Sequence, residues 1–277
     1  MLYGAILGDM IGAPYEFDRG DKTKDFELFT KGSHFTDDTV MTIAIADALL
    51  NVSKDASEQE IKDAVKESML YWGRKYPAAG YGGAFNEWLF SKDPQPYNSW
   101  GNGAAMRVSP VAWWADNVSR VIEVARWTAE VTHNHPEGVR GAVATAVAIF
   151  LARTTFIPIT DENEDEAKAY IKNYIEKRFF YGFDRTCDEI RPDYHHVESC
   201  QETVPEALTA FLEGYDFEDV IRTAVSLGGD CDTLTAIAGS VAEAFYGVPK
   251  DLKKRCRAGL PKEMLLVLDS FEYYAKH

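Results

Sequence analysis

The amino-acid sequence predicts an all-α fold that forms a single domain over residues 1–277. Apolar residues recur at helical spacing along most of the chain. Alternating β-branched runs of useful length do not occur, although 26–30 is compatible with a short extended segment. No internal repeat or low-complexity linker divides the chain, and hydrophobic residues make up 46% of it, which is enough for a substantial core.

The expected helices follow in chain order. The first carries Gly4, Gly8 and Gly12 on one face, which suits close packing against another helix. A helix over 57–76 is amphipathic and begins with a capping-box pattern of Ser57 and Glu60. The other expected helices span 39–50, 104–116, 120–132, 138–152, 161–178, 202–214, 217–227, 233–246 and 265–274. Charged and turn-forming residues predict loops over 19–35, 91–102 and 185–199.

The net charge, the apolar runs and the cysteine spacing limit the classes of function that the chain can have. The formal net charge is −15 and the sequence pI is about 4.8, which disfavours binding to nucleic acid or anionic membranes. The longest apolar run, 141–152, is too short to span a bilayer, and the start of the chain does not resemble a signal peptide. The four cysteines form no C-x-x-C pair and no zinc pattern. We therefore expect a cytoplasmic protein with reduced thiols, and our working assumption is a monomer.

Two acidic clusters lie near opposite ends of the sequence. Thr36-Asp37-Asp38-Thr39 and Asp230-Cys231-Asp232-Thr233 each place carboxylates and threonine hydroxyls at the start of an apolar helix. A single cluster is more often a helix cap. If the fold brings both together, they make a hard-oxygen site for two Mg²⁺ or Mn²⁺ ions, which can share a carboxylate and generate a hydroxide nucleophile. The candidate metal ligands are the aspartates of the two clusters, and the threonine oxygens are plausible additional ligands.

Two further acidic residues lie in or just after the first helix. Asp9 is surrounded by apolar neighbours, and we expect it to be buried and to bond a helix terminus. Glu16 follows Pro14, where a loop can carry it over a cleft as a general acid, a general base or a gate. On spacing alone, a surface glutamate is an equal alternative.

Two polar segments are candidate ligand contacts. Small residues before Ala104 leave backbone N–H groups free for an anion, and Asn102 adds an amide for a phosphate or a sugar hydroxyl. The dinucleotide pattern G-x-G-x-x-G fails at Met106. His133 and His135 lie in a turn, where a ligand contact is favoured over a zinc site. The pair 195–196 is given no partner and no role.

These motifs, in this order, resemble the ADP-ribosylglycohydrolase family over almost the whole chain. The match runs from Gly4-Ala5-Ile6-Leu7-Gly8-Asp9 through Gly101-Asn102-Gly103-Ala104-Ala105-Met106-Arg107 to Tyr246-Gly247. The resemblance implies a compact, orthogonally packed multi-helix bundle with two Mg²⁺ or Mn²⁺ ions in a central cleft. It implies metal-dependent hydrolysis of the glycosidic bond between ADP-ribose and an acceptor. By resemblance the metal ligands are Thr36, Asp37, Asp38, Asp230, Asp232 and Thr233. By resemblance the catalytic residues are Glu16, Asp37 and Asp232, and the substrate contacts are Trp100, Gly101, Asn102, Gly103, Ala104, His133 and His135.

The implied substrate is an ADP-ribosylated protein or an ADP-ribose conjugate, with protein arginine as the leading acceptor. Some relatives that act on ADP-ribosyl-arginine have an acidic residue just ahead of the matching asparagine, whereas this chain reads Asn98-Ser99-Trp100. Serine-linked or small-molecule ADP-ribose conjugates, and a non-catalytic ADP-ribose-binding role, therefore stay open. A role in neutralising an ADP-ribosylating toxin is left open as well.

Overall fold

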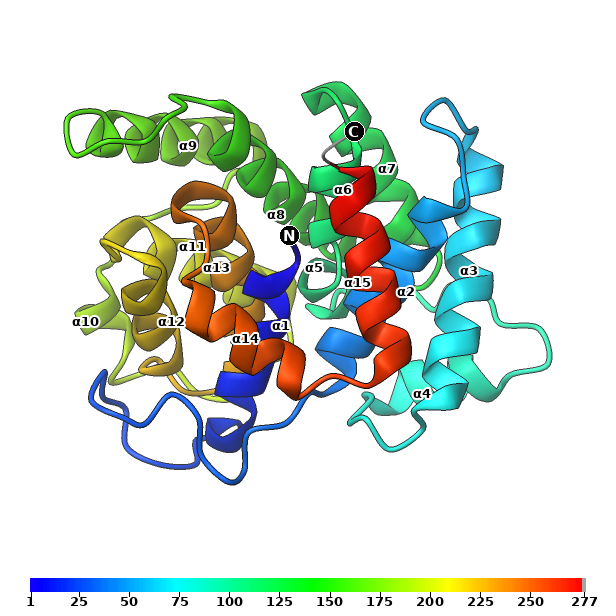
Figure 1. Cartoon of the computed structure of the whole chain (residues 1–277), viewed down its shortest axis with the longest axis horizontal. Coiled ribbons are helices and arrows are strands. Elements are labelled where there is room, and N and C mark those ends of the chain that lie inside the picture. Colours follow the sequence, from blue (N-terminus) through cyan, green and yellow to red (C-terminus); the bar gives the residue numbers. More distant parts are fainter. Residues whose placement is uncertain (276–277) are drawn as a thin grey trace.

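The computed structural model describes residues 1–275 and is built from helices (Figure 1), which confirms the all-α prediction. Within this range the structure contains no strand, and its β-type pairing is the isolated bridge between Gly101 and Ser199. The stretch 26–30 accordingly forms bends rather than the short extended segment that the sequence allowed.

The helices, in chain order, are α1 (Tyr3–Gly12), the 3₁₀ turn η1 (Ala13–Tyr15), α2 (Asp37–Leu50), α3 (Glu58–Lys75), α4 (Gly83–Phe90), α5 (Gly103–Met106), α6 (Ser109–Trp114), α7 (Val118–Glu130), α8 (Pro136–Thr154), α9 (Glu164–Phe179), α10 (Cys187–Ile190), α11 (Cys200–Glu213), α12 (Phe217–Val225), α13 (Cys231–Tyr246), α14 (Lys250–Ala258) and α15 (Lys262–Tyr274). None of them combines the length and the apolar content needed to cross a bilayer. The four cysteines are buried and unpaired.

Helices α1 and α13 pack against each other through their backbones at the centre of the molecule (Figure 1). Every residue of α1 is buried. A Cβ atom on Gly4 would lie 2.0 Å from the Gly239 carbonyl oxygen, and one on Gly8 would lie 2.3 Å from the Thr235 carbonyl oxygen. A Cβ on Gly12 would lie 2.6 Å from the Asp232 Cα. Only glycine allows this approach, so the glycine face of α1 sets the distance between η1 and the acidic start of α13.

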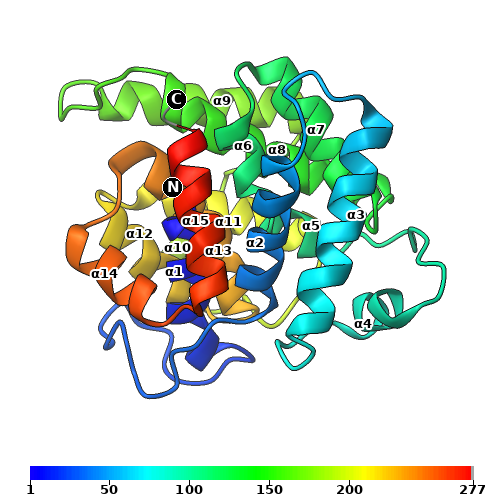
Figure 2. The ribbon, with the colours of Figure 1, turned by 45° about the vertical axis from the view of Figure 1, so that its right-hand side comes forward.

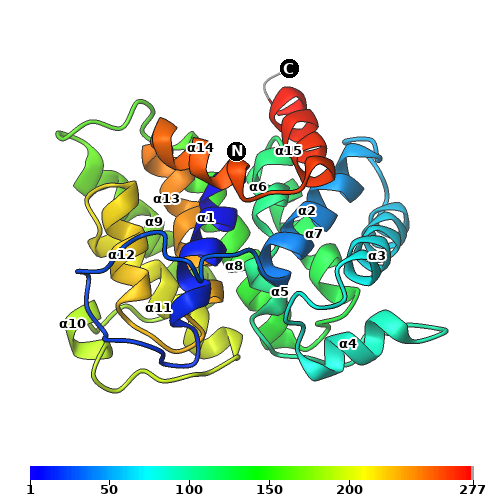
Figure 3. The ribbon, with the colours of Figure 1, turned by 60° about the horizontal axis from the view of Figure 1, so that its bottom comes forward.

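Helix α2 lies between α3 and α15, which contact opposite parts of its surface (Figure 2). The predicted capping box begins α3: the Ser57 backbone N–H donates to Glu60 Oε2 over 2.8 Å, and the Ser57 side chain accepts the Glu60 N–H. The long segment 16–36 connects η1 to α2 and crosses the outside of α12 (Figure 3). Arg222 of α12 holds this segment by donating to the Phe26 carbonyl oxygen over 2.7 Å.

The structure corrects two of the expected boundaries. The expected helix 104–116 is two helices, α5 and α6, because Pro110 has no N–H to bond back to Met106 and falls instead in the first turn of α6. The expected loop 185–199 contains the short helix α10, which begins with a second capping box made by Thr186 and Glu189. Helices α4 and α14 lie in stretches for which the sequence predicted no helix.

Candidate active site

The start of α2 is capped by a residue of α1, as predicted for Asp9. The Asp9 carboxylate is fully buried and accepts the backbone N–H groups of Thr36 and Thr39 over 2.9 Å and 3.0 Å. It also accepts the hydroxyl groups of both threonines. Burial, followed by the charge of Asp232, raises the pKa of Asp9 to about 7. Because Asp9 satisfies this helix terminus, the carboxylates of Asp37 and Asp38 are free for other partners.

The start of α13 is shaped by a double-glycine turn. Gly228 and Gly229 have φ angles of 76° and 73°, a left-handed conformation that glycine adopts without strain. Asp230 follows as the N-cap residue, yet its side chain makes no capping bond. It accepts instead a 2.5 Å hydrogen bond from the Asn102 side-chain amide. The turn thus directs the Asp230 carboxylate toward α5 and away from its own helix.

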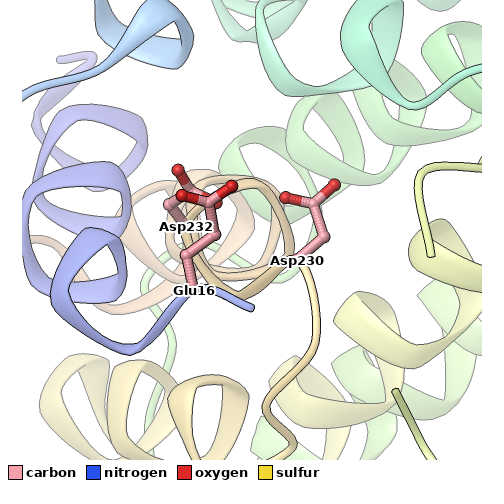
Figure 4. A group of neighbouring side chains, drawn as sticks. All are labelled: Glu16, Asp230 and Asp232. Atoms are coloured by element: carbon pink, nitrogen blue, oxygen red, sulfur yellow. The ribbon is translucent and has the colours of Figure 1, made fainter. Parts of the chain in front are cut away.

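The two acidic clusters meet, although about two hundred residues separate them in sequence. The Thr233 hydroxyl donates to Asp38 Oδ2 over 3.1 Å, across a separation of 195 residues. One carboxylate oxygen each from Glu16, Asp230 and Asp232 lies within 4.8 Å of the others. Figure 4 shows these carboxyl groups directed toward one space, with Glu16 coming from the end of η1 and the aspartates from the start of α13. A cavity of about 220 Å³ opens beside them.

The electrostatics of this cavity favour a bound cation. Burial and the nearby charges raise the pKa of Glu16 to about 7 and raise the pKa values of Asp37 and Asp38 well above the ordinary range. Asp230 and Asp232 shift in the same direction, mainly because they are buried. Oxygen ligands that repel one another in this way suit Mg²⁺ or Mn²⁺.

One carboxylate oxygen at the site tests whether a metal fits. Asp38 Oδ1 is buried and has no hydrogen-bond partner among residues 1–275, whereas its second oxygen accepts the Thr233 hydroxyl. A buried, unpaired carboxylate oxygen is costly unless it is protonated or bound to a cation. The residues present therefore fit a divalent ion.

Most of the predicted site residues line this cavity. They are Glu16, Asp37, Asp38, Gly101, Asn102, Gly103, His133, Asp230, Asp232 and Thr233. Thr36, Trp100, Ala104 and His135 do not line it. Thr36 directs its hydroxyl to Asp9, and Ala104 is buried in α5. His135 caps α8 by accepting the Glu137 N–H over 3.1 Å, and the exposed ring of Trp100 packs edge-on against it at 5.6 Å.

Comparison with known proteins identifies the family of this chain. The family model described as ADP-ribosylglycohydrolase matches residues 1–275. The chain belongs to this family. It is 28% identical to human ADP-ribosylhydrolase ARH3 over 92% of this chain and 87% of that protein. It is also 28% identical to the uncharacterized protein YegU of Escherichia coli, over 89% of this chain and 86% of that protein. A solved structure described as an ADP-ribosylglycohydrolase-related protein complex superimposes with a TM-score of 0.70 at 24% identity, covering 99% of this chain and 96% of that one.

Several residues of this ADP-ribosylglycohydrolase site were not predicted. The cavity is also lined by Met41, Tyr97, Arg107, Glu198, Gly80 and the segment 82–85 at the start of α4. The closely spaced glycines of 80–83 were a visible signal, because such a run allows close approach of a ligand. Arg107 carried no signal of its own, since only the fold shows that its guanidinium is buried beside the cavity.

The loop 191–199 contains a histidine that was predicted to have no partner. His196 is not without partners: its Nε2 lies 3.2 Å from Glu198 Oε1, and its ring packs at a tilt against Phe17, the residue after Glu16, with 4.6 Å between the ring centroids. Asp18 accepts the Gly229 N–H over 2.9 Å. The segment that carries Glu16 is therefore attached both to this loop and to the glycine turn before α13.

Proposed function

We propose that this protein hydrolyses the glycosidic bond between ADP-ribose and an acceptor, with two Mg²⁺ or Mn²⁺ ions bound in the cleft. The observation that carries the proposal is the meeting of two sequence-distant carboxylate clusters around a cavity in a member of the ADP-ribosylglycohydrolase family. A non-catalytic ADP-ribose-binding role would not require carboxylates to be held together at this electrostatic cost.

The proposed ligands of the ions are the oxygen atoms of the two clusters. Asp37 and Asp38 approach from the start of α2, with Asp230, Asp232 and Thr233 opposite them on α13. Thr36 belongs to the proposed set by resemblance, and its oxygen lies at the same helix start. When bound, such ions supply Lewis acidity and a fixed position for ribose hydroxyls and water.

Hydrolysis breaks the bond between the ribose C1″ atom and the acceptor atom, and an oxygen from water takes the place of the acceptor. One proton must leave that water and one must reach the acceptor. A group whose pKa is near 7 can serve in either transfer at neutral pH, and the pKa of Glu16 is raised to about 7. We assign the proton transfer to Glu16, with Asp37 and Asp232 beside it as the other proposed catalytic carboxylates.

Arginine is the proposed acceptor. A guanidinium group suits the acidic lining of the cleft, which includes Glu16 and Glu198. Serine-linked ADP-ribose is the second candidate, and the absence of an acid in Asn98-Ser99-Trp100 favours it. A small ADP-ribose conjugate would use the same groups. The unpaired thiols agree with a cytoplasmic location, which we propose on that ground.

A panel of substrates tests the proposal. ADP-ribose linked to arginine, serine, glutamate, a nucleic-acid base or a small molecule is incubated with the protein in Mg²⁺, in Mn²⁺ or in excess chelator, and released ADP-ribose is measured. We expect release from one or more linkages only when metal is present. Full release in chelator would overturn the metal requirement, and ADP-ribose binding without turnover of any linkage would support the non-catalytic role.

A further inference from the structure

A chain of hydrogen bonds runs behind the cleft wall from α5 to the turn before α8. Arg107 Nη2 donates to the Thr132 hydroxyl oxygen over 2.8 Å. The same oxygen lies 2.7 Å from His133 Nδ1. Arg107, Thr132 and His133 are 2%, 0% and 5% exposed, so water does not compete for these bonds.

The chemistry of the three groups sets the direction of each bond. A guanidinium only donates, so the Thr132 oxygen accepts from Arg107. The Thr132 hydroxyl has one hydrogen, and among residues 1–275 the only acceptor within reach is His133 Nδ1. A buried hydroxyl hydrogen without an acceptor is unfavourable. The hydroxyl therefore donates to Nδ1, which must be the unprotonated nitrogen of the ring.

The remaining nitrogen of His133 then carries the hydrogen. Burial, together with the charge of Arg107, lowers the pKa of His133 well below its ordinary value, so the ring is neutral. A neutral imidazole with an unprotonated Nδ1 has its hydrogen on Nε2.

The Nε2 atom faces the cleft beside the glycine segment of α5. A Cβ atom added to Gly103 would lie 3.2 Å from Nε2, and one added to Gly101 would lie 3.5 Å away. His133 lines the cleft, and no described residue accepts a hydrogen bond from its Nε2. The two glycines thus leave open the space in front of this donor.

We infer that Arg107 and Thr132 are positioning residues that fix His133 as an Nε2–H donor for an oxygen atom of the bound ligand. Neither residue touches the ligand in this account. The ligand as ADP-ribose rests on the proposed function, whereas the tautomer of His133 does not. The donor suits a phosphate or ribose oxygen and offers nothing to a cation.

Nitrogen NMR of the wild-type protein tests the inference without any ligand. Histidine labelled with ¹⁵N distinguishes the two neutral tautomers from the imidazolium, and His133→Asn assigns the signal by its loss. We expect the Nε2–H tautomer at neutral pH. A hydrogen on Nδ1, or a charged ring, would overturn the inference even if the protein hydrolyses ADP-ribose linkages.

Variants test the contribution of the relay to binding. Thr132→Val removes the hydroxyl and keeps the shape of the side chain, so we expect a mixture of His133 tautomers. We also expect the dissociation constant for ADP-ribose, measured by calorimetry, to rise roughly tenfold. Thr132→Ser should restore both. Thr128→Val is the matched control, because its buried hydroxyl donates to the Ala125 carbonyl and to no other group in the described part of the chain. Equal binding by Thr132→Val and wild type would refute the relay; no ADP-ribose binding by wild type would refute the proposed function, and the tautomer would still decide the relay.

Discussion

Asp38 shows at the scale of one residue how the carboxylates depend on one another. One of its oxygens accepts the Thr233 hydroxyl, and the other is buried and unpaired. Its pKa is raised by burial and by neighbouring acids, first among them Asp232. Removing the charge of Asp232 should therefore act in opposite directions on metal-free stability and on activity.

Asp232→Asn is the corresponding test. Without metal, urea unfolding should show a gain in stability of roughly 1 kcal/mol, because the substitution relieves repulsion while its amide oxygen can still accept the Thr233 N–H. With Mg²⁺ or Mn²⁺, kcat should fall by more than the roughly 10–100-fold typical of residues that only support a metal ligand. The exposed Asp161→Asn should change neither quantity, and unaltered turnover in Asp232→Asn would contradict the assignment.

Asn102 distinguishes support of a ligand from contact with substrate. Its amide donates to Asp230 over 2.5 Å and to Thr203 over 3.1 Å. If its main task is to orient Asp230, Asn102→Ala should weaken Mn²⁺ binding by about 10–100-fold, measured by titration under electron paramagnetic resonance. A higher KM with unchanged Mn²⁺ affinity would instead indicate direct substrate contact, which is what the sequence predicts.

At the scale of elements, hydrophobic periodicity predicted the long helices and missed two short ones, α4 and α14. Helix α14 buries only Leu252 and Cys256, so its pattern was too sparse to recognise. Helix α4 begins with glycine, which favours no helix by itself. The break between α5 and α6 at Pro110 was readable from the sequence, and the expected helix wrongly ran through it.

The contact between α1 and α13 leads to a prediction at this scale. Gly8→Ala would place a methyl group 2.3 Å from the Thr235 carbonyl oxygen, so the helices must separate. We expect a loss of about 1–3 kcal/mol or more in the free energy of unfolding. Gly82→Ala is the control, because nothing lies within 4 Å of its added Cβ and its φ of −58° suits alanine. Equal stability of both variants would show that α1 and α13 are not tightly packed.

At the scale of the whole molecule, the clustered carboxylates predict a pH dependence of stability. Glu16 and Asp9 have pKa values of about 7 in the folded protein, above their ordinary values of 4.5 and 3.8. Between those limits the folded state binds more protons than the unfolded state, so stability falls as pH rises from about 4 to 7. In chelator, the melting temperature should be lower at pH 8 than at pH 5.5.

Divalent ions should reverse this trend. Mg²⁺ or Mn²⁺ at a hundred times its dissociation constant should stabilise the protein by about 2.7 kcal/mol and should do so more at pH 8 than at pH 5.5, because protons compete for the same oxygens. The control is a buffer without divalent ions, in which KCl gives the same ionic strength. A melting temperature that rises with pH in chelator would contradict the shared burial of these acids.

The sequence revealed the chemistry of the site better than its shape. The two Thr/Asp clusters, Asn102 and His133 were all recognisable from residue type and spacing. The partners that fix their geometry were not, since the bond from Asn102 to Asp230 and the burial of Arg107 exist only in the folded chain. The contacts of His196 were not predictable, because nothing in the sequence indicates that Phe17 lies against it.

The pairing of α1 with α13 has a consequence for biosynthesis. The Gly4 backbone N–H donates to Glu243, 239 residues further along the chain. At typical translation rates of about 5–20 residues per second, the first helix waits roughly 10–50 s for its partner to leave the ribosome. During that time its apolar residues lack their native cover, so this segment is a natural target for chaperones that act on nascent chains.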